Sequence, residues 1–170
     1  MIRRLLFLTS IAIFATWILR TFLFDTIYVA SGSMEPTLEV GTHYLVSRYI
    51  YRLRDPERGE IVVFTSPEDK KTGFIKRVIA VPGDTVQLRE KKVFLNEKPL
   101  DEPYAIYKRA GDLLSGDNLG PLKVPDDCFF VLGDDRDESD DSTTWKDPQT
   151  GTRIYYLPRQ NIKGRLIQIP

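Results

Sequence analysis

The feature that most constrains this chain is an apolar segment near its N-terminus, Leu5–Phe24. It has about the 20 residues that a helix needs to cross the hydrocarbon core of a bilayer. Its one charged residue, Arg20, lies near the end of the segment, where a long side chain can reach the lipid headgroups. The segment therefore predicts a transmembrane helix rather than an element of a folded core.

Basic residues set the expected orientation of that helix. Arg3 and Arg4 precede the segment, and no basic cluster follows it closely. Because positive charge is retained on the cytoplasmic side, we expect a cytoplasmic N-terminus. The prediction is a single-pass protein of the cytoplasmic (inner) membrane, with a transmembrane anchor over residues 1–25 and a domain outside the cytoplasm over residues 26–170.

Three other interpretations of the apolar segment compete with an anchor. A cleaved signal peptide needs small residues at the first and third positions before the cut; Ala30 supplies one, but Tyr28 is too large for the other. A buried core helix would show a polar face at helical period, and an in-plane helix would carry a cationic face. The segment has neither, so a retained anchor is the prediction.

The rest of the chain has the pattern of a mainly β protein. Short β-rich runs alternate with Pro, Gly and charged turns, which favours sheets packed as a sandwich or barrel. A loop-rich insertion or flap is expected around residues 100–124, where β-branched residues are few. The expected strands lie near Tyr44–Tyr51, Glu60–Thr65, Phe74–Val81, Thr85–Leu88, Lys92–Leu95, Cys128–Leu132 and Arg165–Ile169.

The charge and cysteine content argue against a nucleic-acid-binding protein and against a fold held by internal disulfides. Lys and Arg total 24, as do Asp and Glu, so the chain has no global positive field that would attract nucleic acid. The single cysteine, Cys128, excludes an internal disulfide.

An acidic segment, residues 133–142, follows the expected strand at Cys128–Leu132. A calcium loop of the EF-hand type needs Gly at its sixth position and Glu at its twelfth. Counted from Asp135, these positions hold Asp140 and Lys146, so the pattern fails. A polar turn held by Arg136 and Arg77 is the better interpretation, and no metal is expected.

Ser33 is the candidate nucleophile, because it lies in a short polar segment directly after the expected anchor. A serine attacks an amide only when a base removes its proton. The one histidine, His43, has no feature that marks it as buried beside a carboxylate, although a Ser-His-Asp triad is formally possible.

Lys76 is the candidate base. Side chains alternate along a strand, so Lys76 shares its face with Phe74 and Val78. An apolar environment disfavours an ammonium ion and lowers the pKa of the lysine, which allows a neutral amine to act as general base. Taken alone, the pattern also fits a solvent-facing strand lysine.

Four segments together resemble bacterial type I signal peptidases, also called leader peptidases, a family of serine proteases with a Ser–Lys dyad. The segments agree with the family in order and spacing, and the likeness runs from the anchor to the last strand. They are Ser31–Leu38, Gly41–Val46, Arg58–Phe64 continuing to Lys76–Asp84, and Gly133–Ser142.

The resemblance implies a fold of two antiparallel β-sheets, no cofactor, and a role for each matching residue. Ser33 is similar to the nucleophile, Lys76 to the general base, and Ser31 to the hydroxyl donor that forms the oxyanion hole with the Ser33 N–H. Ser139 is similar to the serine that orients the lysine amine. The residues similar to supporting polar groups are Arg77, Asp134 and Asp141.

The same resemblance implies the substrate. It would be an exported pre-protein with a signal peptide, bound as an extended strand with small residues at the first and third positions before the cut. Besides the pre-protein, the lipid bilayer is an expected partner, and nucleic acid is not. The candidate walls of the two shallow pockets are Val29, Met34, Leu38 and Ile75.

Several positions depart from the family pattern. Asp135 and Glu138 stand where Asn is usual, and Thr143 stands where many members carry an Arg that would pair with Asp141. Thr42 and Ala80 replace a common Asp and Gly. These departures put the electrostatics of the acidic segment in question, and not the reaction class.

Two alternative functions remain open, and a third class is disfavoured. The chain could be a pilin-maturation or conjugation-transfer peptidase of the same class, which a broad substrate panel would separate. It could also be an anchored β-domain that only binds partners. Self-cleaving SOS repressors share the Ser–Lys chemistry, but they carry a DNA-binding domain. No segment of this sequence supplies such a domain.

Overall fold

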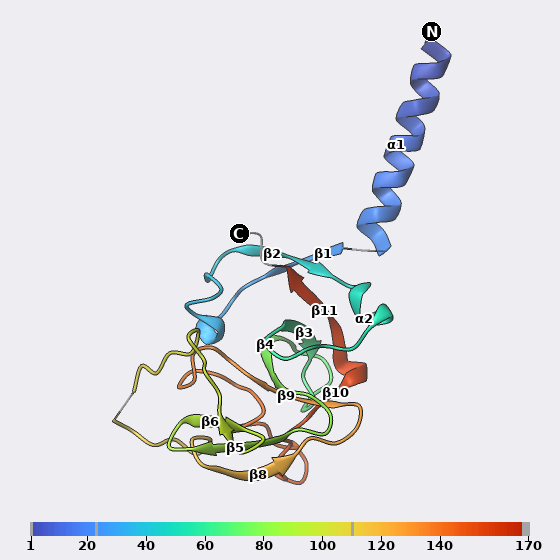
Figure 1. The fold of residues 1–170 in the computed structure, drawn as a ribbon. Helices are drawn as coiled ribbons and strands as arrows, with labels where there is room; N and C mark the ends of the chain where they lie inside the picture. Colours follow the sequence, from blue (N-terminus) through green and yellow to red (C-terminus); the bar gives the residue numbers. More distant parts are fainter. Residues whose placement is uncertain (1, 23, 110, 168–170) are drawn as a thin grey trace.

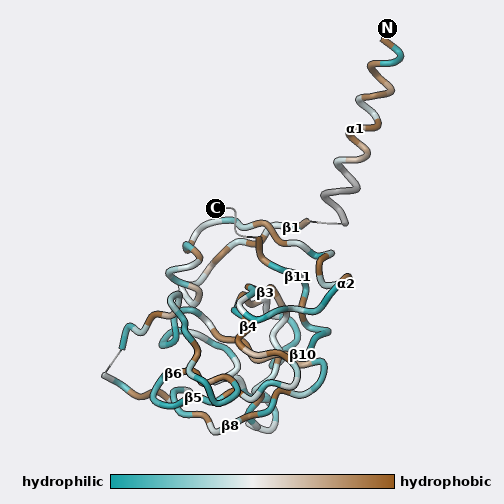
Figure 2. The backbone as a smooth tube through the Cα atoms, in the orientation of Figure 1, coloured by the Kyte–Doolittle hydropathy of each residue, from teal (hydrophilic) through white to brown (hydrophobic). Residues whose placement is uncertain are grey.

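The N-terminal helix projects away from the rest of the molecule (Figure 1). The computed structural model describes residues 2–22, 24–109 and 111–167, and of residues 17–22 the backbone alone. Helix α1 spans Ile2–Phe22, and its residues 2–16 are exposed. Most of them are hydrophobic, as the colours of the helix in Figure 2 show. In this described part of the chain, no helix is both long enough and apolar enough to cross a membrane. Part of the predicted anchor, residues 17–23, lies outside the described side chains.

Two antiparallel sheets form the rest of the protein, which confirms the predicted mainly β fold. The seven-stranded sheet has the order β1 (Phe24–Tyr28), β2 (His43–Ser47), β11 (Ile162–Ile167), β3 (Ile61–Thr65), β4 (Gly73–Ala80), β9 (Cys128–Leu132), β10 (Leu157–Pro158). The four-stranded sheet has the order β7 (Lys98–Pro99), β6 (Lys92–Leu95), β5 (Thr85–Arg89), β8 (Leu119–Lys123). The short helices are η1 (Gly32–Met34), α2 (Ile50–Leu53) and η2 (Arg159–Asn161).

Some element boundaries differ from those that the sequence predicts. The expected strand at Tyr44–Tyr51 ends at Ser47, and the next turn of chain is helix α2. Phe24, placed in the anchor by its hydropathy, begins strand β1. Strand β8 lies inside the segment expected to be a loop-rich insertion; its Pro121 is tolerated because β8 is an edge strand. The last expected strand extends into residues 168–170, which lie outside the described residues.

Strand β9 is buried on both faces, which explains why it is a continuous apolar run. Phe129 and Val131 pack in a core cluster around Trp145, on one side of the strand. Phe130 and Leu132 pack on the other side, in the cluster that joins the two sheets. Because β9 also pairs with β4, the residue that follows it, Gly133, begins a loop directly beside the middle of β4.

Candidate active site

Ser33 lies in a tight turn whose apolar residues fix it to the core. The turn is the single-turn helix η1, in which Glu35 N–H donates to the Gly32 carbonyl over 2.9 Å. Met34 and Leu38, on either side of Pro36, are fully buried together with Val29. The Ser33 side chain therefore has a fixed direction, and its residue is 9% exposed.

Lys76 lies on β4 opposite Val62, and its amine reaches the Ser33 side chain. The distance from Lys76 Nζ to Ser33 Oγ is 2.6 Å. The predicted apolar neighbours are in place: Phe74 packs against the cluster that contains Val78, and the Phe74 ring centroid lies 5.7 Å from Nζ. The lysine residue is 1% exposed, so it is not the solvent-facing strand lysine that the pattern alone also fits.

The environment of Lys76 acts on its pKa in two opposing directions. Burial is the larger effect and lowers the pKa of the amine below its ordinary value. The nearby carboxylates of Asp141, Asp140, Asp134 and Asp135 act in the opposite sense. Because burial prevails, the amine loses its proton at a lower pH than an ordinary lysine does, which is the direction that a general base requires.

The two other serines of the predicted site lie close to this pair. Ser31 Oγ is 3.4 Å from Ser33 Oγ, at the exposed mouth of the turn. Ser139 Oγ is buried and has no hydrogen-bond partner among the described residues. Its position is nevertheless close to the nucleophile, because a Cβ built on Gly133 would meet both Ser139 Oγ at 2.3 Å and the Ser33 carbonyl at 2.5 Å.

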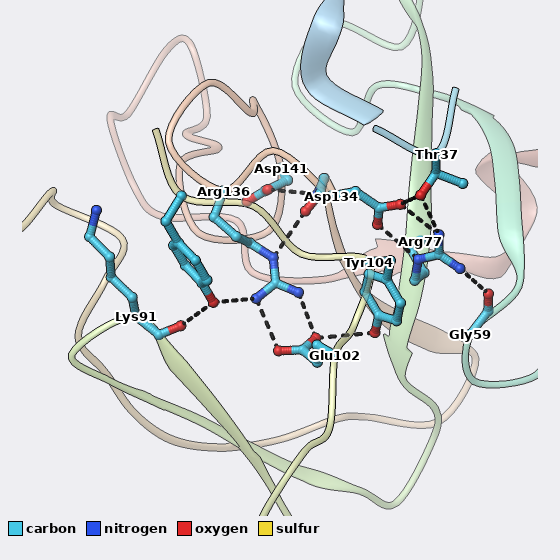
Figure 3. Close-up of polar contacts among 11 residues, drawn as sticks. Thr37, Gly59, Arg77, Lys91, Glu102, Tyr104, Asp134, Arg136 and Asp141 are labelled. Atoms are coloured by element: carbon cyan, nitrogen blue, oxygen red, sulfur yellow. Dashed lines mark hydrogen bonds and ion pairs between the residues drawn. The ribbon is translucent and has the colours of Figure 1, made fainter. Parts of the chain in front are cut away.

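Arg77 and Asp134 form a buried ion pair directly behind the site (Figure 3). The guanidinium donates to both Asp134 oxygens, over 2.8 and 2.6 Å, and to the Gly59 carbonyl over 2.9 Å. Thr37, from the turn that carries Ser33, donates to Asp134 as well. The pair therefore joins β4, the turn that carries Ser33 and the loop after β9.

Asp141 holds the other end of the acidic loop, residues 133–142. Its carboxylate accepts hydrogen bonds from Gly133 N–H over 3.0 Å and from Thr143 N–H and Oγ1 over 3.0 and 2.8 Å. Thr143, whose position raised the question of a missing salt bridge, therefore satisfies Asp141 by neutral hydrogen bonds.

A small cavity of about 90 Å³ opens beside Ser33. Val29, Met34 and Ile75 line it, as expected for pocket walls, together with residues of β1 and the start of β4. Leu38 is not among its lining residues, because its side chain is fully buried in the core behind the turn.

His43 does not lie beside a carboxylate of the site, and the acidic loop is a polar turn. His43 is exposed on β2, with its ring 5.1 Å from the Tyr28 ring. In the acidic loop, the carboxylates of Asp134, Asp135 and Asp137 each pair with a basic side chain. The loop is thus a polar turn held by cations, among which Arg77 was expected.

The sequence did not indicate the segment that covers this loop. Residues 102–109, here named the strap, cross the acidic loop from the inserted segment. Glu102 accepts a bidentate ion pair from Arg136, and Tyr104 stacks on Arg77, with 3.9 Å between the guanidinium carbon and the ring centroid (Figure 3). The sequence around Glu102 and Tyr104 does not reveal these contacts, because their partners Arg136 and Arg77 lie about 30 residues away along the chain.

Comparison with known proteins finds related sequences along almost the whole chain. The sequence profile of the family described as "Signal peptidase, peptidase S26" matches residues 2–169. A Synechocystis protein named "Probable signal peptidase I-2" is 41% identical over 86% of this chain and 63% of its own length. Signal peptidase I P of Bacillus subtilis subsp. natto is 36% identical over 90% of this chain and 87% of its own length.

A solved structure agrees as well. The crystal structure of a signal peptidase I from Enterococcus faecalis V583 superposes with a TM-score of 0.50 at 26% identity, covering 67% of this chain and 98% of the other.

Proposed function

The chain belongs to the signal peptidase family, peptidase S26, which makes it a serine endopeptidase, and we propose that it removes signal peptides from exported pre-proteins with Ser33 as nucleophile and Lys76 as general base. The observation that carries the proposal is the contact of 2.6 Å between the Ser33 hydroxyl oxygen and an amine that is 1% exposed.

The proposed reaction follows from that contact. Neutral Lys76 takes the hydroxyl proton of Ser33 as Oγ attacks the scissile carbonyl carbon. The Ser31 hydroxyl and the Ser33 N–H donate to the developing oxyanion; one such donor is worth about 3 kcal/mol. The Lys76 ammonium then protonates the leaving amine. Water, activated by the same amine, hydrolyses the acyl-enzyme.

The remaining site residues have supporting roles in this proposal. Arg77, Asp134 and Asp141 hold the acidic loop against β4 and the nucleophile turn. Ser139, whose buried hydroxyl has no described partner, is proposed to orient the Lys76 amine. The 90 Å³ cavity supports a substrate with small side chains before the cut, because a larger side chain would not fit between Val29, Met34 and Ile75.

The pH dependence of turnover tests the base. Below its pKa the Lys76 amine is protonated and cannot accept the hydroxyl proton, so kcat/KM should rise with pH through a lysine pKa that burial has lowered below the ordinary value of about 10.4. The measurement is kcat/KM for a signal-peptide substrate across pH. The rising, low-pH part of this profile, here called the acid limb, should be unchanged in His43→Ala. An acid limb that disappears in His43→Ala would indicate a triad instead.

The signal peptidase I family is membrane-associated. We propose that α1 anchors the enzyme, with residues 1–25 as the transmembrane part and residues 26–170 outside the cytoplasm. Exposed apolar side chains along residues 2–16, and Arg3 and Arg4 at the start, support this topology.

Fractionation of cells that express the full chain tests this topology. The protein should stay in the membrane after an alkaline carbonate wash, and protease added to spheroplasts should digest the domain. Release by carbonate, or protection of the domain from added protease, would contradict the proposed arrangement.

A further inference from the structure

Lys108 of the strap is surrounded by three carboxylates at the edge of the active site. Its Nζ lies 2.7 Å from Asp135 Oδ2, 3.1 Å from Glu35 Oε2 and 3.7 Å from Glu138 Oε2. These acids come from two different segments, since Glu35 is in the nucleophile turn and the other two are in the acidic loop. One ammonium therefore connects the strap to both halves of the site.

Of the three acids, Asp135 depends most on the Lys108 counter-ion. Its side chain is 0% exposed, and Lys108 is the one cation within 4.0 Å of it among the described residues. Its Oδ2 accepts no hydrogen bond among the described residues and meets the Lys108 ammonium only as an ion pair, and Oδ1 accepts only a long bond of 3.3 Å from Asp137 N–H. A carboxylate removed from water is costly unless a counter-ion neutralises it.

The charge of Asp135 matters because of where its backbone lies. Asp135 N–H donates to the Ser33 carbonyl over 3.2 Å, next to the contact between Ser33 and Lys76. The strap is fixed at the same point, since Ile106 N–H donates to the Asp134 carbonyl over 2.8 Å and Arg136 N–H donates to the Ile106 carbonyl over 3.1 Å. An unneutralised Asp135 would thus place a negative charge beside the reacting pair.

The other charged groups that face Lys76 are already compensated to different degrees. Asp134 is paired with Arg77, and Asp141 is satisfied by neutral donors. Asp140 accepts a hydrogen bond from Thr144, on an exposed part of the loop. The full set of carboxylates that favour the protonated amine is Asp134, Asp135, Asp140 and Asp141. In this set Asp135 is the buried member whose neutralisation comes from the strap.

We propose that Lys108 is a positioning residue of this enzyme: it neutralises Asp135 behind the nucleophile and thereby keeps the Lys76 amine in its uncharged, proton-accepting form. This inference rests on the proposed Ser33–Lys76 dyad. It gives the inserted segment a role in the chemistry, although the strap need not touch the substrate.

The test uses the full chain in detergent and follows the acid limb of kcat/KM against pH for a signal-peptide substrate. Lys108→Met should move the limb to higher pH by about 0.5 to 1 unit, because the uncompensated carboxylate favours protonated Lys76. Asp135→Asn should move it to lower pH, and the double variant should return it close to the wild-type position. Lys108→Arg, which keeps the charge, should leave the limb unchanged.

A matched control is Lys98→Met, which removes an exposed lysine from the hairpin at β7. The inference would be overturned if the acid limb does not move in Lys108→Met, or if it moves equally in Lys98→Met. It would also be overturned if adding Asp135→Asn to Lys108→Met does not return the limb to the wild-type position. If Lys108→Met does not fold, Asp135→Asn decides, since a limb that stays in place there overturns it too. A general loss of stability would lower activity without moving the limb in opposite directions.

The outcome also separates this inference from the proposed function. If Lys76→Met retains normal turnover, the dyad itself is wrong. If Lys76→Met is inactive while the Lys108 and Asp135 variants leave the limb unmoved, the dyad stands and the role of Lys108 is rejected.

Discussion

Ser33→Ala and Lys76→Met are each expected to reduce pre-protein processing by roughly 10³-fold or more, while the protein stays folded. Ser33→Ala removes the attacking oxygen, and Lys76→Met removes the amine that lies 2.6 Å from it. Met keeps most of the volume of lysine, so the apolar wall of Phe74 and Val78 remains filled. Single-turnover cleavage of a pre-protein, measured beside thermal unfolding, gives both quantities.

The unfolding data make this prediction specific. Because a buried amine must be removed from water, Lys76→Met should be at least as stable as the wild type, which separates a catalytic role from a structural one. Lys98→Met serves again as the matched control and should process normally. Normal turnover by either active-site variant would rule out the dyad, and an inactive variant that is also unfolded would leave Ser33→Ala as the deciding measurement.

Asp134→Ala is expected to destabilise the domain by about 3–5 kcal/mol, because it leaves the Arg77 guanidinium buried without its counter-ion. The same substitution at an exposed ion pair gives the control. Asp25 lies 3.8 Å from Arg48, and their side chains are 61% and 56% exposed, so Asp25→Ala should cost less than about 1 kcal/mol.

Urea unfolding midpoints at a common slope measure both changes. Activity should fall with Asp134→Ala even under conditions where the variant is folded, since Thr37 and Arg77 both lose the carboxylate that joins them to the acidic loop. Equal midpoints for the two variants would show that the buried pair does not fasten the loop to β4.

The parts of the fold that the sequence predicts well are those with a strong local pattern. Strand β9 is a run of apolar residues because both of its faces are buried, and β4 alternates so that Lys76 shares a face with Phe74 and Val78. The apolar character of Met34 and Leu38, which fix the Ser33 turn to the core, is also visible in the sequence. Local pattern does not show which face such a residue adopts, so Leu38 was assigned to a pocket wall when it is a core residue.

The parts that the sequence could not predict depend on partners far away along the chain. Considered alone, the many carboxylates in the loop after β9 would repel one another. The departures of Asp135 and Glu138 from the family pattern left open how these charges are neutralised. In the folded protein, Asp135 and Glu138 meet Lys108, whose segment reads locally as a surface insertion. Strand β8 was missed for a related reason, because its pairing with β5 outweighs the weak strand propensity of Gly120 and Pro121.

The near-complete burial of Lys76 has a consequence for the order of events. Its amine lies 2.6 Å from Ser33 Oγ and the residue is 1% exposed, so in the proposed reaction the peptide and the hydrolytic water both approach the amine beside the serine oxygen. The cleaved chain must then leave this position before a water molecule can occupy it. Slow release of that chain would limit the rate of the whole cycle.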